Sequence, residues 1–264
     1  MRYQTCPLPG EYVQPAFRLR ISHEGASALK LEHVGGILRL DPLVLPNENA
    51  RCVVTWNEAE RLQGARQAVE QARRPTVLSQ EPVGDWLRQF GAVDTVAFPA
   101  EIDGLQIEAV TYEPVPYATP AEGLRKIRSA MINPVRAVNR IRQRVQLPDT
   151  LPSILQITLP TGERLLHLNC ALHRGTDADW LSEQAKRFGK ADWTIVGVDF
   201  EESDAMCELI GHFEPQELLV TDLVNDVRTK LGLPTELVTP TVDKLCDAGF
   251  RAHVFATDAS FRFE

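Results

Sequence analysis

The chain has 264 residues, 44% of them hydrophobic and 24% charged, which is enough apolar sequence to bury a substantial core. A formal net charge of -8 argues against the whole surface being a nucleic-acid platform. No stretch has the pattern of a signal peptide or the ~18 apolar residues of a membrane span. We therefore expect a cytoplasmic protein with no membrane association.

The cysteines are few and scattered, and none belongs to a Cys-x-x-Cys pair. An odd, dispersed set indicates reduced thiols, and neither a disulfide framework nor a zinc knuckle. The five are Cys6, Cys52, Cys170, Cys207 and Cys246.

The first part of the chain predicts strands followed by alternating strands and helices. An alternating strand over residues 17–21 precedes a hairpin with arms at 27–33 and 37–40, which closes on Asp41-Pro42. A β-branched run then ends at Thr55, and a helix follows over 61–73. Further on we predict a strand at 76–78, a helix at 82–90, and strands at 95–98 and 105–112 around an Asp103-Gly104 turn.

Residues 120–146 differ in composition from the rest of this acidic chain. Apolar residues recur at three- and four-residue steps, so the segment is predicted as one kinked or two amphipathic helices. Its basic residues either form a solvated helix face or a lid that binds an anionic ligand or an acidic partner. They are Arg125, Lys126, Arg128, Arg136, Arg140, Arg142 and Arg144.

The second half continues the alternation. We predict strands at 153–158, 164–170, 193–199, 218–221, 250–255 and 261–263, and helices at 177–188, 203–211 and 239–248. Alternating strands and helices of this kind indicate an α/β protein.

The corner from Cys52 to Ala65 resembles the signature of the metallo-β-lactamase fold, Thr-His-x-His-x-Asp-His followed by a glycine. The threonine is kept as Thr55 and the glycine as Gly64, and the hairpin that ends in Asp-Pro adds to the likeness. The resemblance implies an α/β fold, a four-layer αββα sandwich. It implies a single domain over residues 1–264 with a helical insertion at about 120–146.

The metal ligands of that signature are replaced in this chain. The resemblance places Trp56, Glu58 and Arg61 at the histidine positions and Glu60 at the aspartate position. Further along, Asn169-Cys170 stand where the family has Gly-Asp, Asp222 stands where it has its last histidine, and the segment around Tyr117 offers no histidine. We therefore expect a degenerate metal site, a pseudoenzyme and no metal cofactor.

The replaced corner still has to balance its charges. One hypothesis is that Arg61 pairs with Glu58 or Glu60 and substitutes for the metal, while Trp56 fills the vacated volume. The other is that the corner is partly exposed and its charges are solvated. His167 lies on a predicted strand, where a satisfied core or rim histidine is the plainer interpretation.

Three functions remain open at this stage. The first is a non-hydrolytic protein that binds a partner protein or a small anionic ligand through the loop edge and the basic insertion; its possible ligand-binding residues are Asp41, Tyr117, His167, Arg125 and Arg128. The second is a metal-dependent hydrolase of phosphodiesterase, lactonase or thioesterase type. Its zinc or other ion would be held by atypical ligands from among Asp41, Glu58, Glu60, His167, Cys170 and Asp222. The third, nucleic-acid binding by the insertion, is the least favoured, because no platform of interleaved aromatic residues is present. Catalytic residues are not identified, and a homodimer is compatible with the sequence.

Overall fold

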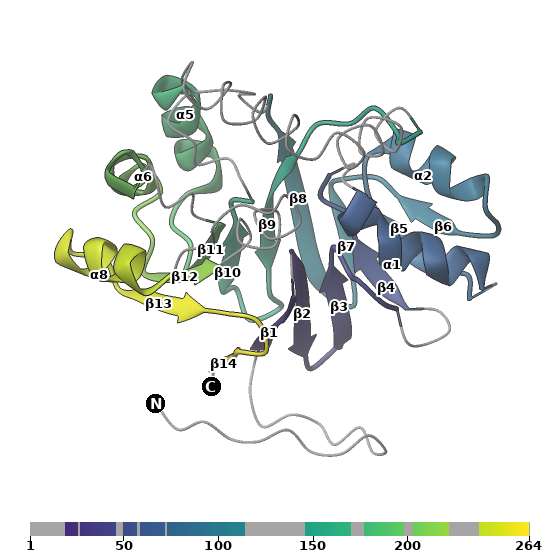
Figure 1. Ribbon diagram of the computed structural model, residues 1–264, viewed down its shortest axis with the longest axis horizontal. Coiled ribbons are helices and arrows are strands. Elements are labelled where there is room, and N and C mark those ends of the chain that lie inside the picture. The colour runs from purple at the N-terminus through teal and green to yellow at the C-terminus, as the bar shows by residue number, and fades with distance from the viewer. Residues whose placement is uncertain are drawn as a thin grey trace, which may run out of the picture.

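The computed structural model describes residues 19–25, 27–45, 50–56, 59–71, 73–113, 146–169, 177–197, 203–221 and 238–263. They form two seven-stranded sheets that face each other, with helices on the two outer sides (Figure 1). The predicted fold class, a four-layer αββα sandwich, is confirmed.

The first sheet combines an antiparallel half and a parallel half. β14 (Ser260–Phe263), β1 (Leu19–Gly25), β2 (Ala28–His33) and β3 (Gly36–Leu40) are antiparallel neighbours in that order. β4 (Arg51–Val53), β5 (Thr76–Leu78) and β6 (Asp94–Val96) then follow β3 in parallel.

The second sheet repeats this division. β13 (Ala252–Phe255), β12 (Glu217–Thr221), β11 (Trp193–Gly197) and β10 (Arg164–His167) are parallel neighbours. β9 (Ser153–Thr158), β8 (Leu105–Thr111) and β7 (Ala100–Ile102) continue the sheet in antiparallel order.

The space between the sheets is filled by apolar side chains from both. Because side chains alternate along a strand, every second residue of a strand points into this layer. Leu19 and Ile21 of β1 meet Leu155 and Ile157 of β9 in one buried cluster, while Arg20 and Ser22 lie on the outer side of the first sheet. This inner core holds the two sheets together.

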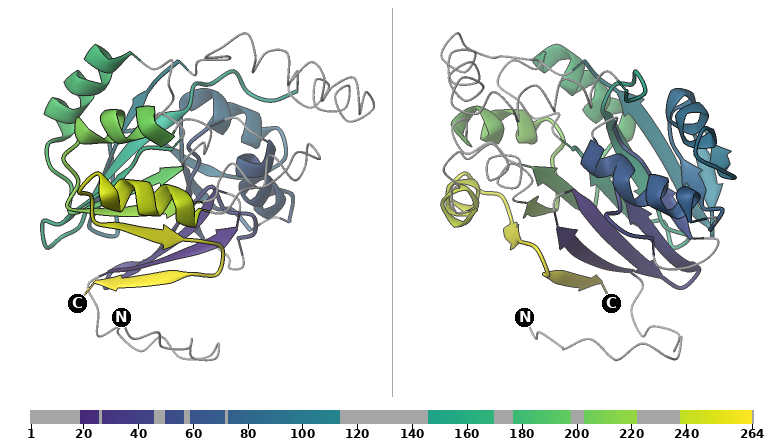
Figure 2. Two further views of the ribbon diagram at one scale, coloured as in Figure 1. Left: turned by 60° about the vertical axis from the view of Figure 1, so that its left-hand side comes forward. Right: turned by 45° about the vertical axis from the view of Figure 1, so that its right-hand side comes forward.

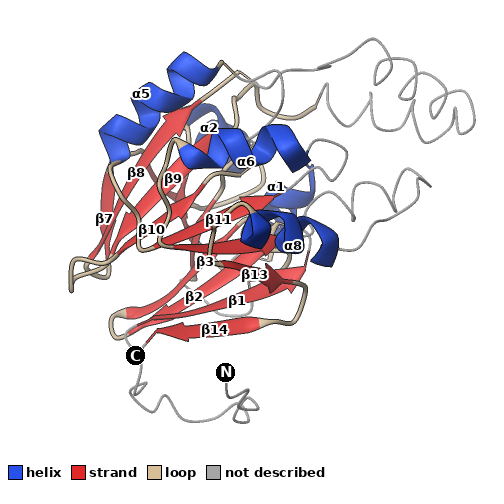
Figure 3. Ribbon diagram, turned by 90° about the vertical axis from the view of Figure 1, so that its left-hand side faces the viewer, coloured by secondary structure: helices blue, strands red, loops and turns tan. Residues whose placement is uncertain are grey.

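Helices cover each outer face. α1 (Ala59–Glu70) and α2 (Glu81–Arg88) pack on the parallel half of the first sheet. α5 (Ala178–Phe188), α6 (Ser203–Gly211) and α8 (Thr239–Asp247) cover the second sheet, as Figures 2 and 3 show from two sides. Strands of the second sheet are therefore buried on both faces, and all five residues of β12 are buried.

Most predicted elements are found within a few residues of their expected bounds, and one strand was missed. The Asp103-Gly104 turn joins β7 to β8, not residues 95–98 to β8. The chain leaves the first sheet after β6 and enters the second at β7, through Phe98-Pro99. The predicted 120–146 insertion lies outside the described residues, except for its last residue. None of the helices in the described ranges has the length and hydrophobicity of a membrane span.

Candidate site at the carboxyl edge of the sheets

Asp41 and Thr55 meet because they follow two parallel neighbouring strands. β3 ends at Leu40 and pairs with Val53 at the end of β4, so the next residues of both strands reach the same edge. The Asp41 carboxylate accepts hydrogen bonds from the Thr55 backbone N–H (2.7 Å) and the Thr55 hydroxyl (2.5 Å). Both residues are fully buried. The Asp41 side chain thus fixes the chain where it leaves β4.

Arg61 enters this corner from the first turns of α1. Its Nη1 lies 2.7 Å from Asp41 Oδ2 and donates to the Thr55 hydroxyl at 2.8 Å. The guanidinium carbon also lies 5.7 Å from the centre of the half-buried Trp56 ring, within the range of a cation–π contact. Arg61 is therefore held between a carboxylate and an aromatic face.

Gly64 allows α1 to approach the loop after β3. A Cβ atom at this position would lie 2.1 Å from the Pro42 carbonyl oxygen, and the Gly64 N–H donates to that oxygen at 3.0 Å. A side chain would push the helix outward and withdraw Arg61 from Asp41. The glycine of the signature thus has a steric role in this chain.

Asn169 brings the second sheet into the corner. It follows β10 with a φ of 55°, a left-handed conformation that glycine and asparagine tolerate best. Its Nδ2 donates to the Thr55 hydroxyl at 3.2 Å and to the Ser153 carbonyl at 3.4 Å. The Ser153 N–H in turn donates to the Thr55 carbonyl at 3.0 Å. These contacts therefore join both sheets. We call the four residues that make them the edge cluster: Asp41, Thr55, Arg61 and Asn169.

The electrostatics of the edge cluster are those of a buried ion pair. Burial raises the pKa of the Asp41 carboxyl, and the Arg61 guanidinium and the Thr55 hydrogen bonds oppose that rise. A buried carboxylate needs this compensation because desolvation penalises its charged form. Arg61 supplies it with a fixed positive charge.

His167 lies at the end of β10 and faces the inner core, like Leu165 two residues before it. Its pKa is lowered to about 3, first by burial and then by the neighbouring Arg61 and His23. Neither ring nitrogen has a hydrogen-bond partner among the described residues. The histidine is buried as predicted, but its expected hydrogen bonds are not found in this part of the chain.

The structure brings together five of the predicted site residues and leaves others outside its description. Asp41, Trp56, Arg61, His167 and Asn169 gather at this edge. The partner described for Arg61 is Asp41, which the sequence-based hypothesis did not include. Only the backbone of Glu60 is described, and the remaining residues lie outside the described ranges: Glu58, Tyr117, Arg125, Arg128, Cys170 and Asp222.

Sequence reasoning missed His23 and Ser153 at this edge. β1 runs four residues further than predicted, and alternation from Leu19 and Ile21 points His23 into the inner core. Ser153 contributes backbone groups, for which its side chain gives no signal. Extending the alternation past Ile21 would have identified His23.

The described residues do not form a metal site. No three of their His, Cys, Asp or Glu side chains gather in a way that could hold an ion. At the corner itself the Arg61 guanidinium contacts Asp41, and its positive charge would repel a metal ion there. The side chains described at this corner are a carboxylate, a guanidinium, a hydroxyl and an amide, and this part of the donor set does not fit the histidine-rich metal centre that the fold resemblance implies.

Comparisons with known proteins support the fold. No protein-family model matches the sequence, and no curated protein matches it significantly. Among solved structures, Igni18, a metallo hydrolase from Ignicoccus hospitalis KIN4/I, superposes with a TM-score of 0.61 at 12% identity, over 93% of this chain and 98% of that one. An isothiocyanate hydrolase from Delia radicum gut bacteria gives a TM-score of 0.58 at 10% identity, over 93% and 99% of the two chains.

A third structure belongs to a larger protein. CmlA, a diiron β-hydroxylase from Streptomyces venezuelae, matches with a TM-score of 0.58 at 11% identity over 94% of this chain but 55% of its own. This chain therefore spans about half the length of CmlA. At such identities the likeness concerns the fold alone, and the fold of this chain is that of the metallo-hydrolase-like α/β sandwich.

Proposed function

We propose that the protein is a non-hydrolytic, metallo-hydrolase-like protein, a pseudoenzyme that binds a small anionic ligand or a partner protein at the edge formed by the edge cluster. The observation that carries the proposal is the Arg61–Asp41 pair, 2.7 Å apart and buried. It places a protein cation in the corner where the metallo-β-lactamase signature has its ligands.

The hydrogen bonds of the edge cluster support a role without a bound ion. Both oxygens of Asp41 accept hydrogen bonds, and the Thr55 hydroxyl donates one and accepts two. A carboxylate with these partners is compensated within the protein. A metal in this corner would first have to displace Arg61.

The same edge offers groups for recognition. The Trp56 ring is half-buried, and Asn169 Oδ1 has no hydrogen-bond partner among the described residues. An aromatic face beside a buried acceptor that lacks a partner in the described ranges suits a ligand with an apolar part and a donor group that reaches below the surface. The preference for an anion is a prediction that rests on the basic insertion, including Arg125 and Arg128.

The test is the metal content of the purified protein, measured by elemental analysis before and after incubation with zinc, manganese and ferrous ions. We expect metal far below one ion per chain in the wild type. We also expect no hydrolysis of phosphodiester, lactone or thioester model substrates. Near-stoichiometric metal, together with hydrolysis that a chelator abolishes, would overturn the proposal.

A metal-dependent hydrolase is the second candidate, favoured by His167. A neutral imidazole is the form that binds metal ions, and its lowered pKa keeps His167 neutral with both ring nitrogens lacking hydrogen-bond partners in the described ranges. Ligands from outside those ranges, such as Glu58, Cys170 and Asp222, would have to complete the site. The comparison of wild type with His167→Gln separates the candidates, because only the hydrolase would lose bound metal.

A further inference from the structure

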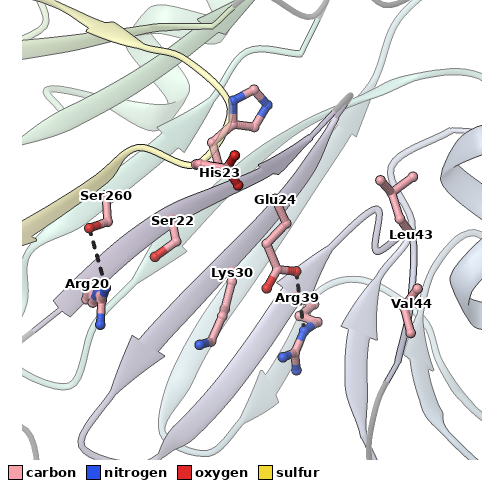
Figure 4. A pocket seen from close by; sticks show the side chains of 10 residues that line it. Arg20, Ser22, His23, Glu24, Lys30, Arg39, Leu43, Val44 and Ser260 are labelled. Atoms are coloured by element: carbon pink, nitrogen blue, oxygen red, sulfur yellow. Dashed lines mark hydrogen bonds and ion pairs between the residues drawn. The ribbon is translucent and has the colours of Figure 1, made fainter. Parts of the chain in front are cut away.

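A pocket of about 560 Å³ opens on the outer side of the first sheet, away from the inner core. Strands β1, β2, β3 and β14 form its floor, and Leu43 and Val44 from the loop after β3 form one wall (Figure 4). The described helices of this sheet, α1 and α2, pack on its parallel half and leave this antiparallel half uncovered. We call this cavity the outer pocket; its volume is in the range of small-molecule sites.

A row of polar side chains crosses the floor. Ser260, Ser22, Lys30 and Arg39 are directly paired across β14, β1, β2 and β3, so all four stand on one face of the sheet (Figure 4). Arg20 adds a third cation from β1, and its Nη2 donates to the Ser260 hydroxyl at 3.5 Å. The row presents hydroxyl groups at one end and positive charge at the other.

Two of the pairings on this face bring like charges together, although Glu32 lies opposite Arg20 on its other side. Lys30 lies directly opposite Arg39, and Arg20 lies directly opposite Arg262. Like charges in directly opposed positions destabilise a sheet. A bound anion would relieve the repulsion in these two pairs. The antiparallel half is therefore suited to binding an anion.

The neighbouring carboxylate leaves Arg39 able to take another partner. Glu32 lies 2.9 Å from Lys30 and 3.6 Å from Arg20, and Glu24 lies 3.5 Å from the Nε atom of Arg39. The contact to Arg39 is longer than a charge-assisted hydrogen bond and engages one of its three nitrogens. Its terminal nitrogens keep the fork geometry that binds phosphate.

We propose that the outer pocket binds a phosphate ester of a small, hydroxyl-rich compound. Lys30 and Arg39 hold the phosphate, with the Ser22 hydroxyl as a further donor. The carboxylates of Glu24 and Asp258, which also line the pocket, would repel a bare polyanion but accept hydrogen bonds from hydroxyl groups. This mixture of charges selects a phosphorylated polyol over inorganic phosphate.

Isothermal titration of the full chain with ribose 5-phosphate, inorganic phosphate and ribose tests the proposal at low ionic strength. We expect ribose 5-phosphate to bind more tightly than inorganic phosphate and ribose not to bind. Lys30→Gln and Arg39→Gln should each weaken the binding of ribose 5-phosphate about tenfold or more. The matched controls Lys190→Gln and Arg88→Gln, which remove exposed cations elsewhere, should leave it unchanged.

Three outcomes would overturn the proposal: no binding of either phosphate compound, equal losses in the pocket variants and the controls, or ribose binding as tightly as its phosphate. Thermal melting without ligand confirms that each variant is folded, and Ser22→Ala provides a milder second change in the pocket. The outcome is independent of the edge cluster. Trp56→Leu should leave the affinity for ribose 5-phosphate unchanged, because Trp56 belongs to the candidate site and not to the outer pocket.

Discussion

The edge cluster and the outer pocket lie on the two sides of one short segment of chain. Asp41 turns inward to Arg61, whereas Leu43 and Val44 line the outer pocket. Both regions combine arginines, carboxylates and hydroxyl groups. They differ in burial, since the side chains of Asp41 and Arg61 are 0% and 4% exposed and those of Glu24 and Arg39 are 34% and 12% exposed.

Burial decides what a cation can do. In the edge cluster, separation of the ions would leave a desolvated charge, so Arg61 is committed to Asp41. In the outer pocket the carboxylates keep more contact with water, so exchanging an internal partner for a ligand costs less than separating the buried pair of the edge cluster. The same residue types thus stabilise structure in one place and are suited to binding in the other.

The largest effect is expected from Arg61→Ala. Removal of the guanidinium leaves Asp41 buried without its compensating charge, and the free energy of unfolding should fall by about 3–5 kcal/mol. Urea unfolding at pH 7 measures this. Arg74→Ala, which removes an exposed ion pair with Asp94, should lose less than about 1 kcal/mol. Equal losses in the two variants would mean that the edge cluster is no stronger than a surface ion pair.

Gly64→Ala should cost somewhat less, about 1–3 kcal/mol, because the new methyl group clashes with the Pro42 carbonyl and α1 must shift. Gly211→Ala is the control, since its Cβ would meet no atom within 4 Å. The same urea titration applies. If Gly64→Ala is as stable as the control, the close approach of α1 to the loop is not required.

The third expectation concerns the pH dependence of stability. The pKa of His167 is about 3 in the folded protein, below the ~6.5 of an unfolded chain, so the unfolded state binds the proton first. The stability from neutral His167 is complete above pH ~6.5 and is lost as the pH falls toward 3. Between pH 7 and 5 this amounts to about 1–2 kcal/mol.

His167→Leu should remove that part of the pH dependence, measured as the difference between unfolding free energies at pH 7 and pH 5. His212→Gln, at a half-buried turn after α6, should keep it. If this difference is the same in His167→Leu as in the wild type, the pKa of His167 is not lowered in the folded protein.

The smallest effect is expected in the outer pocket. Lys30→Gln removes one ion pair with Glu32 and one unfavourable opposition to Arg39, so the two changes nearly cancel. We expect the free energy of unfolding to stay within about 0.5 kcal/mol of the wild type. If the free energy of unfolding falls by more than about 2 kcal/mol, Lys30 stabilises the fold as Arg61 does.

The fold could be predicted from the sequence because alternation and helical periodicity along the chain agree with the sheets that the strands form. The hairpin that ends in Asp41, the strand before Thr55 and the helices all form where alternation and helical periodicity indicate. β7 was missed because three residues carry almost no periodicity, and it belongs to a sheet that the preceding strand does not share.

The candidate site was predictable in location but not in connectivity. Thr55 and Gly64 marked the corner, but the choice of Asp41 as the partner of Arg61 depends on the parallel pairing of β3 with β4. No spacing along the chain reveals that contact. The outer pocket was missed for the same reason, because its row of side chains exists only once four strands are in register.

The pairing of β14 with β1 has a consequence for biosynthesis. A hydrogen bond between these strands joins Arg20 and Ser260, 240 positions apart. Ser260 is translated 240 residues after Arg20, so β1 leaves the ribosome with its outer edge still unpaired. An open strand edge of this kind invites pairing with other chains. Chaperones that shield early β-structure would therefore be expected to raise the yield of folded protein.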